Sequence, residues 1–178
     1  MTGPLLKITH LSKRFDGIVA LSDLSLSINP SEVVGLIGPN GAGKTTLFNT
    51  IFGFIRPESG EILFRDRNLV GKRPSQIARL GIARTFQDVR LIHHLTVVEN
   101  VLLCFQDQPG ERLAPLFFKP RQTRTVETAN HQRAMALLDD VDLTAHADQL
   151  AEALSYGQQK LLSIACCLAG RAELLLLD

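Results

Sequence analysis

One short segment limits the folds open to this chain more than any other. Residues 38–45 read Gly-Pro-Asn-Gly-Ala-Gly-Lys-Thr and match the pattern GxxxxGK[ST]. The continuous apolar run before it, residues 33–37, is typical of a strand covered on both faces. After it, apolar residues recur at helical spacing, at Leu47, Phe48, Ile51 and Phe52. The order strand, glycine loop, helix predicts an α/β fold with a parallel core.

The glycine loop has the composition of a phosphate-binding loop, or P-loop. Glycines let backbone N–H groups converge on phosphate oxygens, and a helix starting at Lys44 directs its positive dipole end to the same place. Lys44 would bind the β- and γ-phosphates, and Thr45 would offer its hydroxyl to Mg²⁺. A chance glycine turn is the alternative. The predicted nucleotide-binding residues are Gly38, Pro39, Asn40, Gly41, Ala42, Gly43, Lys44, Thr45 and Thr46, with ATP and Mg²⁺ as cofactors.

The rest of the chain divides into a β-rich start and a helical middle. Leu24, Leu26 and Ile28 alternate with serines, and Asp16-Gly17 indicates a hairpin, so an antiparallel β part is expected before the P-loop. The turn Asn29-Pro30-Ser31 follows. The remaining expected elements are helices at 74–80, 97–106, 124–138 and 158–168 and a strand at 173–178.

The predicted helices carry their own signals. Thr96 and Glu99 form a capping-box pattern for the helix 97–106, and Gly81 stops the helix 74–80. In the helix 124–138 the candidate core residues are Val126, Ala129, Leu137 and Leu138. Residues 88–153 are interpreted as a helical subdomain inside one domain, 1–178.

Composition excludes several classes of protein. The 178 residues are 45% hydrophobic and 21% charged, an ordinary globular mixture. A formal net charge of +1 provides no basic field, so no nucleic-acid partner is expected. The three cysteines lack metal-site spacing and are interpreted as free core thiols of a reduced compartment. No apolar stretch is long enough for a membrane span, so membrane association would require a partner.

A second motif separates the P-loop families. Leu154-Ser155-Tyr156-Gly157-Gln158 resembles the signature sequence of ABC ATPases, with Tyr156 in place of the usual first glycine. Alone it would be an ordinary turn before a helix, which Ser155 can cap. After a P-loop, the resemblance implies that this segment contacts the γ-phosphate of a nucleotide held by the opposite subunit.

Further segments resemble the same family and imply further site residues. Gln87, in Arg84-Thr85-Phe86-Gln87, matches the Q-loop glutamine that touches Mg²⁺ and the attacking water, and an exposed Gln is the alternative. Asp178, after four leucines, matches the Walker B carboxylate for Mg²⁺, and a plain core strand is the alternative. Phe15 matches the aromatic residue that stacks on adenine, and a core phenylalanine is the alternative. Gln87 and Asp178 are thus the implied catalytic residues and, with Thr45, the implied Mg²⁺ ligands.

Several segments look like the ATPases of branched-chain amino-acid importers and their urea or amide relatives. They are residues 83–87 and 95–100, the long insert between Phe105 and Arg133, and the Tyr-Gly-Gln-Gln signature. The resemblance implies ATP hydrolysis that drives solute import at the cytoplasmic face of the plasma membrane. It also implies a homo- or heterodimer of ATP-binding subunits, transmembrane permease partners and, indirectly, a solute-binding protein.

The resemblance further implies residues that this sequence does not contain. In the family a glutamate that acts as general base follows the Walker B aspartate, and a histidine that senses the γ-phosphate comes later. Asp178 is the last residue here, so the chain is expected to be C-terminally truncated and inactive as given. A non-catalytic nucleotide-binding fragment and a non-transport ABC ATPase remain the rival interpretations.

Overall fold

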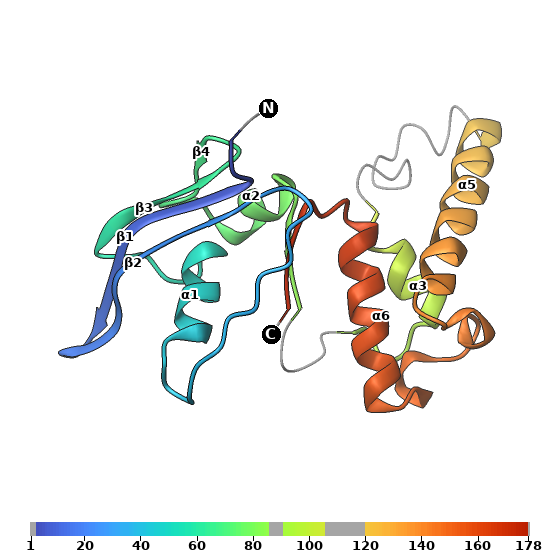
Figure 1. Ribbon diagram of the computed structural model, residues 1–178. Coiled ribbons are helices and arrows are strands. Elements are labelled where there is room, and N and C mark those ends of the chain that lie inside the picture. The colour runs from blue at the N-terminus through green and yellow to red at the C-terminus, as the bar shows by residue number, and fades with distance from the viewer. Residues whose placement is uncertain (1–2, 86–90, 106–119, 178) are drawn as a thin grey trace. The chain divides into compact units, whose positions relative to one another are not determined.

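The computed structural model describes residues 3–85, 91–105 and 120–177, without the side chains of 120–125. The chain forms two compact units, Met1–Ile82 and Ala83–Asp178, called here the first and second units (Figure 1). Among the described residues, no helix has the length and apolar character needed to cross a bilayer.

The first unit is built on a four-stranded antiparallel sheet. Its strands pair in the order β2-β1-β3-β4. The β1–β2 hairpin turns at Asp16-Gly17, where both residues have positive φ, so the predicted hairpin and the predicted antiparallel part are confirmed. The strands are β1 (Leu6–Phe15), β2 (Ile18–Ile28), β3 (Ser59–Phe64) and β4 (Arg67–Asn68).

Two helices complete the first unit, and both were predicted. They are α1 (Lys44–Ile51), which starts directly after the glycine loop, and α2 (Pro74–Arg79). Gly53 and Gly81 follow the two helix ends with φ of 78° and 98°. A side chain at Gly53 would also place its Cβ 2.5 Å from the Lys72 carbonyl oxygen, so only glycine fits there.

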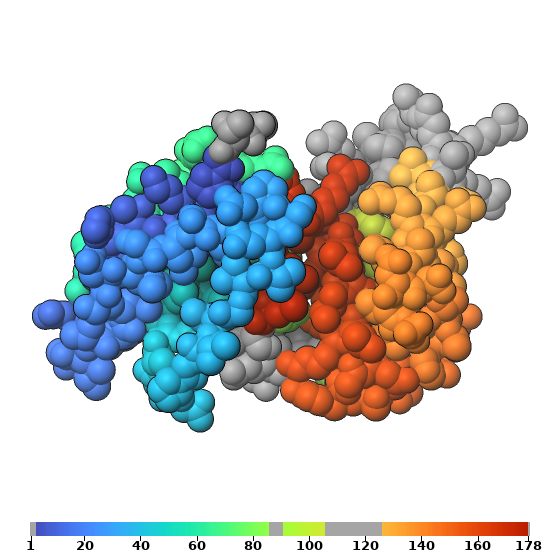
Figure 2. Space-filling model, in the orientation of Figure 1, coloured from blue at the N-terminus to red at the C-terminus, as the bar shows by residue number. Residues whose placement is uncertain are grey.

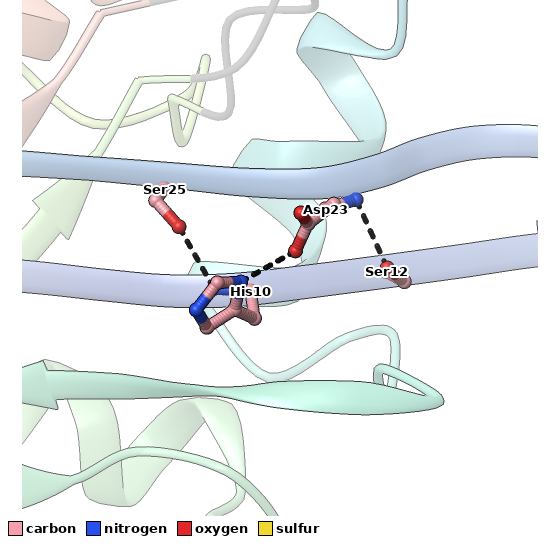
Figure 3. Close-up of polar contacts among 4 residues, drawn as sticks. All are labelled: His10, Ser12, Asp23 and Ser25. Atoms are coloured by element: carbon pink, nitrogen blue, oxygen red, sulfur yellow. Dashed lines mark hydrogen bonds and ion pairs between the residues drawn. The ribbon is translucent and has the colours of Figure 1, made fainter.

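A double β-bulge interrupts the β1–β2 pairing near its middle. His10 and Asp23 both have positive φ, 50° and 48°, and the strand register shifts around them. Figure 3 shows how side chains replace the lost ladder bonds: His10 N–H donates to Ser25 Oγ (2.9 Å) and Asp23 N–H to Ser12 Oγ (3.0 Å). His10 Nδ1 lies 2.6 Å from Asp23 Oδ1 and ties the two strands together. These residues therefore stabilise a bend in the hairpin.

This group is not a catalytic Ser-His-Asp triad, despite its composition. Both serine hydroxyls accept from backbone N–H groups, and the contacts of His10 shown in Figure 3 are to Asp23 and, through its backbone, to Ser25. The His10 and Asp23 side chains are 72% and 71% exposed, so the pair is solvated on both sides. A nucleophile activated by an imidazole needs a hydrogen bond between the two groups, and this arrangement has none.

The predicted strand at residues 33–37 is wrong. The segment has no strand hydrogen bonding, and Val33 and Ile37 are 98% and 95% exposed. A buried strand needs hydrogen-bonded neighbours, and the strands of both sheets described here pair with one another instead. The segment remains an extended, exposed approach to α1, seen in light blue on the surface of the first unit (Figure 2).

The second unit is mainly helical, with three helices that pack against one another. Side chains of α3, α5 and α6 form one hydrophobic cluster that includes Val101, Leu138 and Leu162, all fully buried. Because α6 shares this cluster, the predicted limits of a helical subdomain, 88–153, stay a prediction. The elements are α3 (Val97–Leu102), α5 (Pro120–Asp139), η2 (Thr144–His146), η3 (Ala151–Ala153), α6 (Tyr156–Ala169) and the short strand β6 (Leu174–Leu176). Strand β6 pairs with β5 (Ile82–Arg84), which begins at the last residue of the first unit.

Two predictions in the helical part need correction. Helix α3 ends at Leu102, because the next turns tighten and bring Phe105 into the cluster; Gln106 lies outside the described residues. In α5, Leu138 is buried as predicted and Leu137 partly so, but Val126 and Ala129 are exposed. The cluster reaches only the C-terminal half of α5, from Ala134 onward, which leaves the earlier apolar positions in solvent.

Asn100 is the polar centre of the helical cluster. It is 4% exposed, and its Oδ1 accepts from Ile92 N–H (2.9 Å), while its Nδ2 donates to the carbonyls of Ile92, Leu95 and Thr96. The amide thus holds the segment before α3 against the helix. The predicted capping box is present as well: hydrogen bonds from Thr96 N–H and Oγ1 hold the pKa of Glu99 below its usual range.

We expect Asn100→Leu to lower the free energy of unfolding by roughly 1–3 kcal/mol. The three carbonyls keep backbone donors, but Ile92 N–H would lose its acceptor at a part-buried position, and a donor left unsatisfied costs up to about that much. Urea unfolding followed by circular dichroism measures the change. Gln132→Leu, the same type of replacement at an exposed position of α5, should change stability by less than about 0.5 kcal/mol. Equal stability of the two variants would contradict the assigned role.

The three cysteines are free thiols, as predicted, although they are half-buried rather than fully buried. Cys104 and Cys166 both donate to the Asn100 carbonyl oxygen, at 3.4 and 3.5 Å. The interaction between the two neighbouring thiols lowers the pKa of Cys104 and, together with burial, raises that of Cys166. Burial raises the pKa of Cys167 to about 11.

Candidate functional site

The glycine loop turns sharply and delivers the chain into α1. Gly41 and Gly43 have φ of 84° and 85°, a left-handed conformation that favours glycine. Gly43 is the N-cap of α1, and its carbonyl accepts the first helical hydrogen bond from Leu47 N–H at 2.8 Å. Ala42 N–H closes the preceding turn on the Pro39 carbonyl at 3.2 Å. The positive end of α1 therefore faces the loop.

Gly43 also lies against the sheet. A Cβ at this position would come within 2.3 Å of the Ala20 carbonyl oxygen and 3.2 Å of the Leu21 side chain in β2. Both the positive φ and this contact require glycine. Strand β2 of the antiparallel sheet thus packs against the glycine loop at Gly43, a contact that the motif alone does not reveal.

Lys44 reaches back over the loop that it follows. Its Nζ donates to the carbonyl oxygens of Gly38 (2.6 Å) and Pro39 (2.8 Å). Among the described residues, no carboxylate forms an ion pair with Lys44. A half-buried ammonium beside a helix N-terminus, held only by carbonyls, leaves its positive charge available for an anion.

These features suit the phosphates of a nucleotide and a magnesium ion. The glycine conformations form a backbone concavity, and Lys44 adds positive charge. The Thr45 side chain is exposed at the first turn of α1, so its hydroxyl is accessible to a metal, and Thr46 is half-buried, with its carbonyl bound to Thr50 Oγ1 (2.7 Å). When bound, Mg²⁺ would neutralise charge on the transferred phosphate.

The signature-like segment forms the N-terminus of α6, in the second unit. Ser155 is the N-cap, as expected: its Oγ accepts from Gln158 N–H (3.3 Å), and Gln158 Oε1 accepts from Ser155 N–H (2.9 Å). The helix begins at Tyr156, earlier than expected. Gly157 has open space around a hypothetical Cβ, and Tyr156 is exposed with Lys160 Nζ 5.4 Å from its ring. The turn presents a serine hydroxyl and helix N–H groups together, a suitable anion contact.

One residue near this turn escaped the sequence reasoning. His146, in η2, has its Nε2 3.0 Å from Gln158 Nε2 and its Nδ1 3.0 Å from Gln149 Oε1. His146 and Gln158 are 12 positions apart, in different elements joined by turns and a short 3-10 helix, so no helical or strand period connects them. Only the tertiary structure brings this imidazole to the capping box.

Phe15 lies at the tip of the β1–β2 hairpin and is 42% exposed. The core alternative is therefore not supported. Lys13 Nζ lies 5.1 Å from the ring centroid, a cation–π contact that leaves much of the ring accessible. An exposed aromatic face is what stacking on a base requires, and the stacking role stays a proposal.

We expect Phe15→Ala to weaken ATP and GTP binding to a similar extent, by about 5- to 150-fold, since base–aromatic stacking contributes roughly 1–3 kcal/mol. Phe15→Tyr should be nearly silent. Ile18→Ala, at the paired and more exposed position of the hairpin, is the control and should leave affinity unchanged. Titration with a fluorescent ATP analogue measures this. A lower melting temperature with intact affinity in Phe15→Ala would show a purely structural residue.

The remaining predicted site residues are not placed by the structure. Gln87 and Asp178 lie outside the described residues, so the Q-loop and Walker B assignments stay predictions. The strand before Asp178 is present as β6, with Leu174 and Leu176 buried, although it is shorter than the expected 173–178. The P-loop belongs to the first unit and the Ser155 turn to the second.

Known proteins resemble the chain throughout its length. The family model described as ABC transporter matches residues 21–178. The high-affinity branched-chain amino acid transport ATP-binding protein LivG of Escherichia coli K12 is 43% identical over 178 residues, which cover all of this chain and 70% of LivG.

Solved structures are similar in the same way. An ATP-binding cassette of an ABC transporter in its ADP conformation is 33% identical with a TM-score of 0.77, covering 98% of this chain and 68% of that one. A dimeric cassette in a post-hydrolysis state, bound to ADP and Pi, is 29% identical with a TM-score of 0.74, covering 97% and 73%.

Proposed function

The chain belongs to the ABC transporter family, and from this membership we propose that it is the ATP-binding subunit of an importer. In this proposal, ATP hydrolysis drives the uptake of branched-chain amino acids or related small solutes. The observation that carries nucleotide binding is the loop at the start of α1, where the partners of Lys44 among the described residues are the backbone carbonyls of Gly38 and Pro39. The solute class rests on the identity with LivG.

The predicted site residues bind the phosphates, the metal, the attacking water and the base. The backbone of residues 38–46 binds the phosphates, and Lys44 offsets their charge. Thr45, Gln87 and Asp178 hold Mg²⁺, Gln87 also orients the attacking water, and Phe15 stacks on adenine. The chemistry is thus mainly positioning and electrostatic stabilisation of a transferring phosphoryl group.

We further propose that the hydrolytic site is shared between two ATP-binding subunits. The P-loop of one subunit binds the nucleotide, and Leu154, Ser155, Tyr156, Gly157 and Gln158 of the other cover its γ-phosphate. The capping geometry at Ser155 supports this role, because it directs a hydroxyl and the N–H groups of α6 outward from an exposed turn. The dimeric cassette bound to ADP and Pi is a precedent in a similar protein.

The proposed assembly includes transmembrane permease subunits, with the ATPase peripheral at the cytoplasmic face of the membrane. The helical part of the second unit would contact the permease, and a solute-binding protein would act through the permease alone. The rival in the same class is an importer of urea or amides. A non-transport ABC ATPase with a long coiled coil between P-loop and signature is disfavoured by the short interval between these two motifs.

Uptake measurements in the source cell separate these functions. We expect deletion of the gene, or replacement by Lys44→Ala, to abolish uptake of radiolabelled leucine, isoleucine and valine and to leave urea uptake intact. The wild-type gene supplied in trans is the control. Loss of urea uptake with normal leucine uptake would assign the rival solute, and normal uptake of both would reject an importer of either solute.

We also propose that residues 1–178 by themselves bind MgATP but do not turn it over. Their predicted site residues hold the phosphates and the metal, and the implied general base is not among them. Phosphate release from residues 1–178 should then equal that of the Lys44→Ala variant. Residues 1–178 should nevertheless bind a fluorescent ATP analogue more tightly than this variant does. Turnover by residues 1–178 as fast as by a C-terminally extended version would refute this.

A further inference from the structure

A chain of four polar side chains leads into the proposed γ-phosphate contact. Gln149 Oε1 lies 3.0 Å from His146 Nδ1, and His146 Nε2 lies 3.0 Å from Gln158 Nε2. Gln158 Oε1 accepts from Ser155 N–H at 2.9 Å, and Ser155 Oγ accepts from Gln158 N–H at 3.3 Å. This series of hydrogen-bonded side chains, called here the relay, therefore ends on the N-cap of α6.

The direction of every hydrogen bond in this relay is determined by one backbone group. Ser155 N–H can only donate, so the oxygen of the Gln158 amide must face it. The NH₂ group of Gln158 then faces His146, whose Nε2 must be an unprotonated acceptor. The imidazole proton consequently resides on Nδ1 and is donated to Gln149 Oε1. Only the neutral Nδ1–H tautomer satisfies all four side chains.

The histidine end of the relay is anchored through the backbone that follows His146. Ala147 is buried in the hydrophobic cluster, and its carbonyl accepts Val98 N–H at 3.0 Å. The Gln149 carbonyl accepts Val97 N–H at 2.9 Å, so the backbone around His146 also caps the N-terminus of α3. The Ser155 turn joins the cluster through the buried Leu154, whose carbonyl accepts from Gln159 Nε2 at 3.2 Å.

We propose that His146 is a positioning residue for the Ser155 turn. It holds the Gln158 amide in its capping orientation, and through that amide it orients Ser155 toward the phosphate of the partner's nucleotide. This inference rests on the proposed function, in which Ser155 makes that contact. Without an acceptor at Nε2, the Gln158 amide is free to rotate away from Ser155 N–H, and the serine loses its fixed direction.

The tautomer provides a test that is independent of nucleotide. In ¹⁵N-histidine-labelled protein, the ring nitrogens of His146 should show a protonated Nδ1 and an unprotonated Nε2. Gln158→Glu removes the NH₂ donor, so His146 should switch to the Nε2–H tautomer and donate to the new carboxylate. The opposite tautomer in the unmodified protein, or no switch in Gln158→Glu, would overturn the relay.

The functional test compares turnover in the ATPase assembled with its permease. His146→Phe keeps the ring and removes both nitrogens, and should lower kcat by about 2- to 10-fold, the effect of one net hydrogen bond. The KM for ATP should stay the same, because the P-loop is untouched. His146→Gln, which can place an amide oxygen near the site of Nε2, should recover most of the turnover. Lys7→Ala, at an exposed position of β1 in the first unit, is the control and should leave turnover unchanged.

A double-mutant comparison identifies the route of action. If His146 acts through Gln158, His146→Phe should have no further effect in a Gln158→Ala background. Additive losses would overturn the inference, as would full turnover in His146→Phe. If Ser155→Arg abolishes turnover but His146→Phe does not lower it, the proposed function stands and only the inference fails. If Ser155→Arg retains turnover, the role of the whole turn fails, and with it that of His146.

Discussion

Lys44→Ala should weaken MgATP binding by about 30- to 5,000-fold. Removing one partner of a hydrogen-bonded charge pair in a binding site costs roughly 2–5 kcal/mol, because the other charge is left without its counter-charge. The P-loop has no neighbouring cation among the described residues that could take over, since Lys44 alone reaches the carbonyls of Gly38 and Pro39. A titration with a fluorescent ATP analogue measures the affinity.

The stability of the protein should change little in this variant, which separates binding from folding. The two carbonyls that Lys44 contacts lie in an exposed loop, where water can replace the ammonium. Lys7→Ala, which removes an exposed lysine from β1 of the same unit, is the matched control and should leave both affinity and melting temperature unchanged. Unaltered ATP affinity in Lys44→Ala would refute the proposed phosphate site.

Ser155→Arg should reduce ATP turnover by at least about 100-fold while leaving ATP binding by the single subunit intact. The donors that stabilise charge on a transferring group typically contribute about 10²–10³ in kcat, and the arginine side chain would also fill the space in front of the α6 N-terminus. Ser155 contacts Gln158 within its own unit, so the P-loop in the first unit keeps its structure. Phosphate release and nucleotide titration measure the two quantities.

Mixing the two variants tests whether the site is shared. A dimer of one Lys44→Ala chain and one Ser155→Arg chain contains one intact composite site and one site with both defects. Phosphate release should therefore reappear on mixing, and sedimentation with ATP should show the dimer. A dimer that stays inactive after mixing would indicate that each chain completes its own site, as would full activity of the wild-type monomer.

Local patterns alone predicted much of the fold. The structure contains the predicted β1–β2 hairpin, helix α1 at Lys44, helix α2 before Gly81 and the caps at Thr96 and Ser155. Each depends on neighbours within a few residues, through a turn conformation, a capping bond or a short apolar period, so the sequence contains the necessary information.

Long-range packing explains where these predictions failed. Residues 33–37 have the apolar run of a buried strand, but a strand also needs partners, and none of the strands described here pairs with it. Val126 has helical spacing, but only the later half of α5 meets the hydrophobic cluster. Apolar composition signals that a segment can be buried, whereas burial itself depends on what the rest of the chain places beside it.

The sequence by itself determined the chemistry of the P-loop and of the Ser155 cap, because each motif is contiguous and its backbone conformation follows from its own residues. The tertiary structure decided which distant groups support them. Ala20 in β2 lies behind Gly43, Asn100 holds the segment before α3, and His146 reaches Gln158 across an irregular stretch. Contacts of this kind depend on how loops and helices close in space, and no short-range period in the sequence records them.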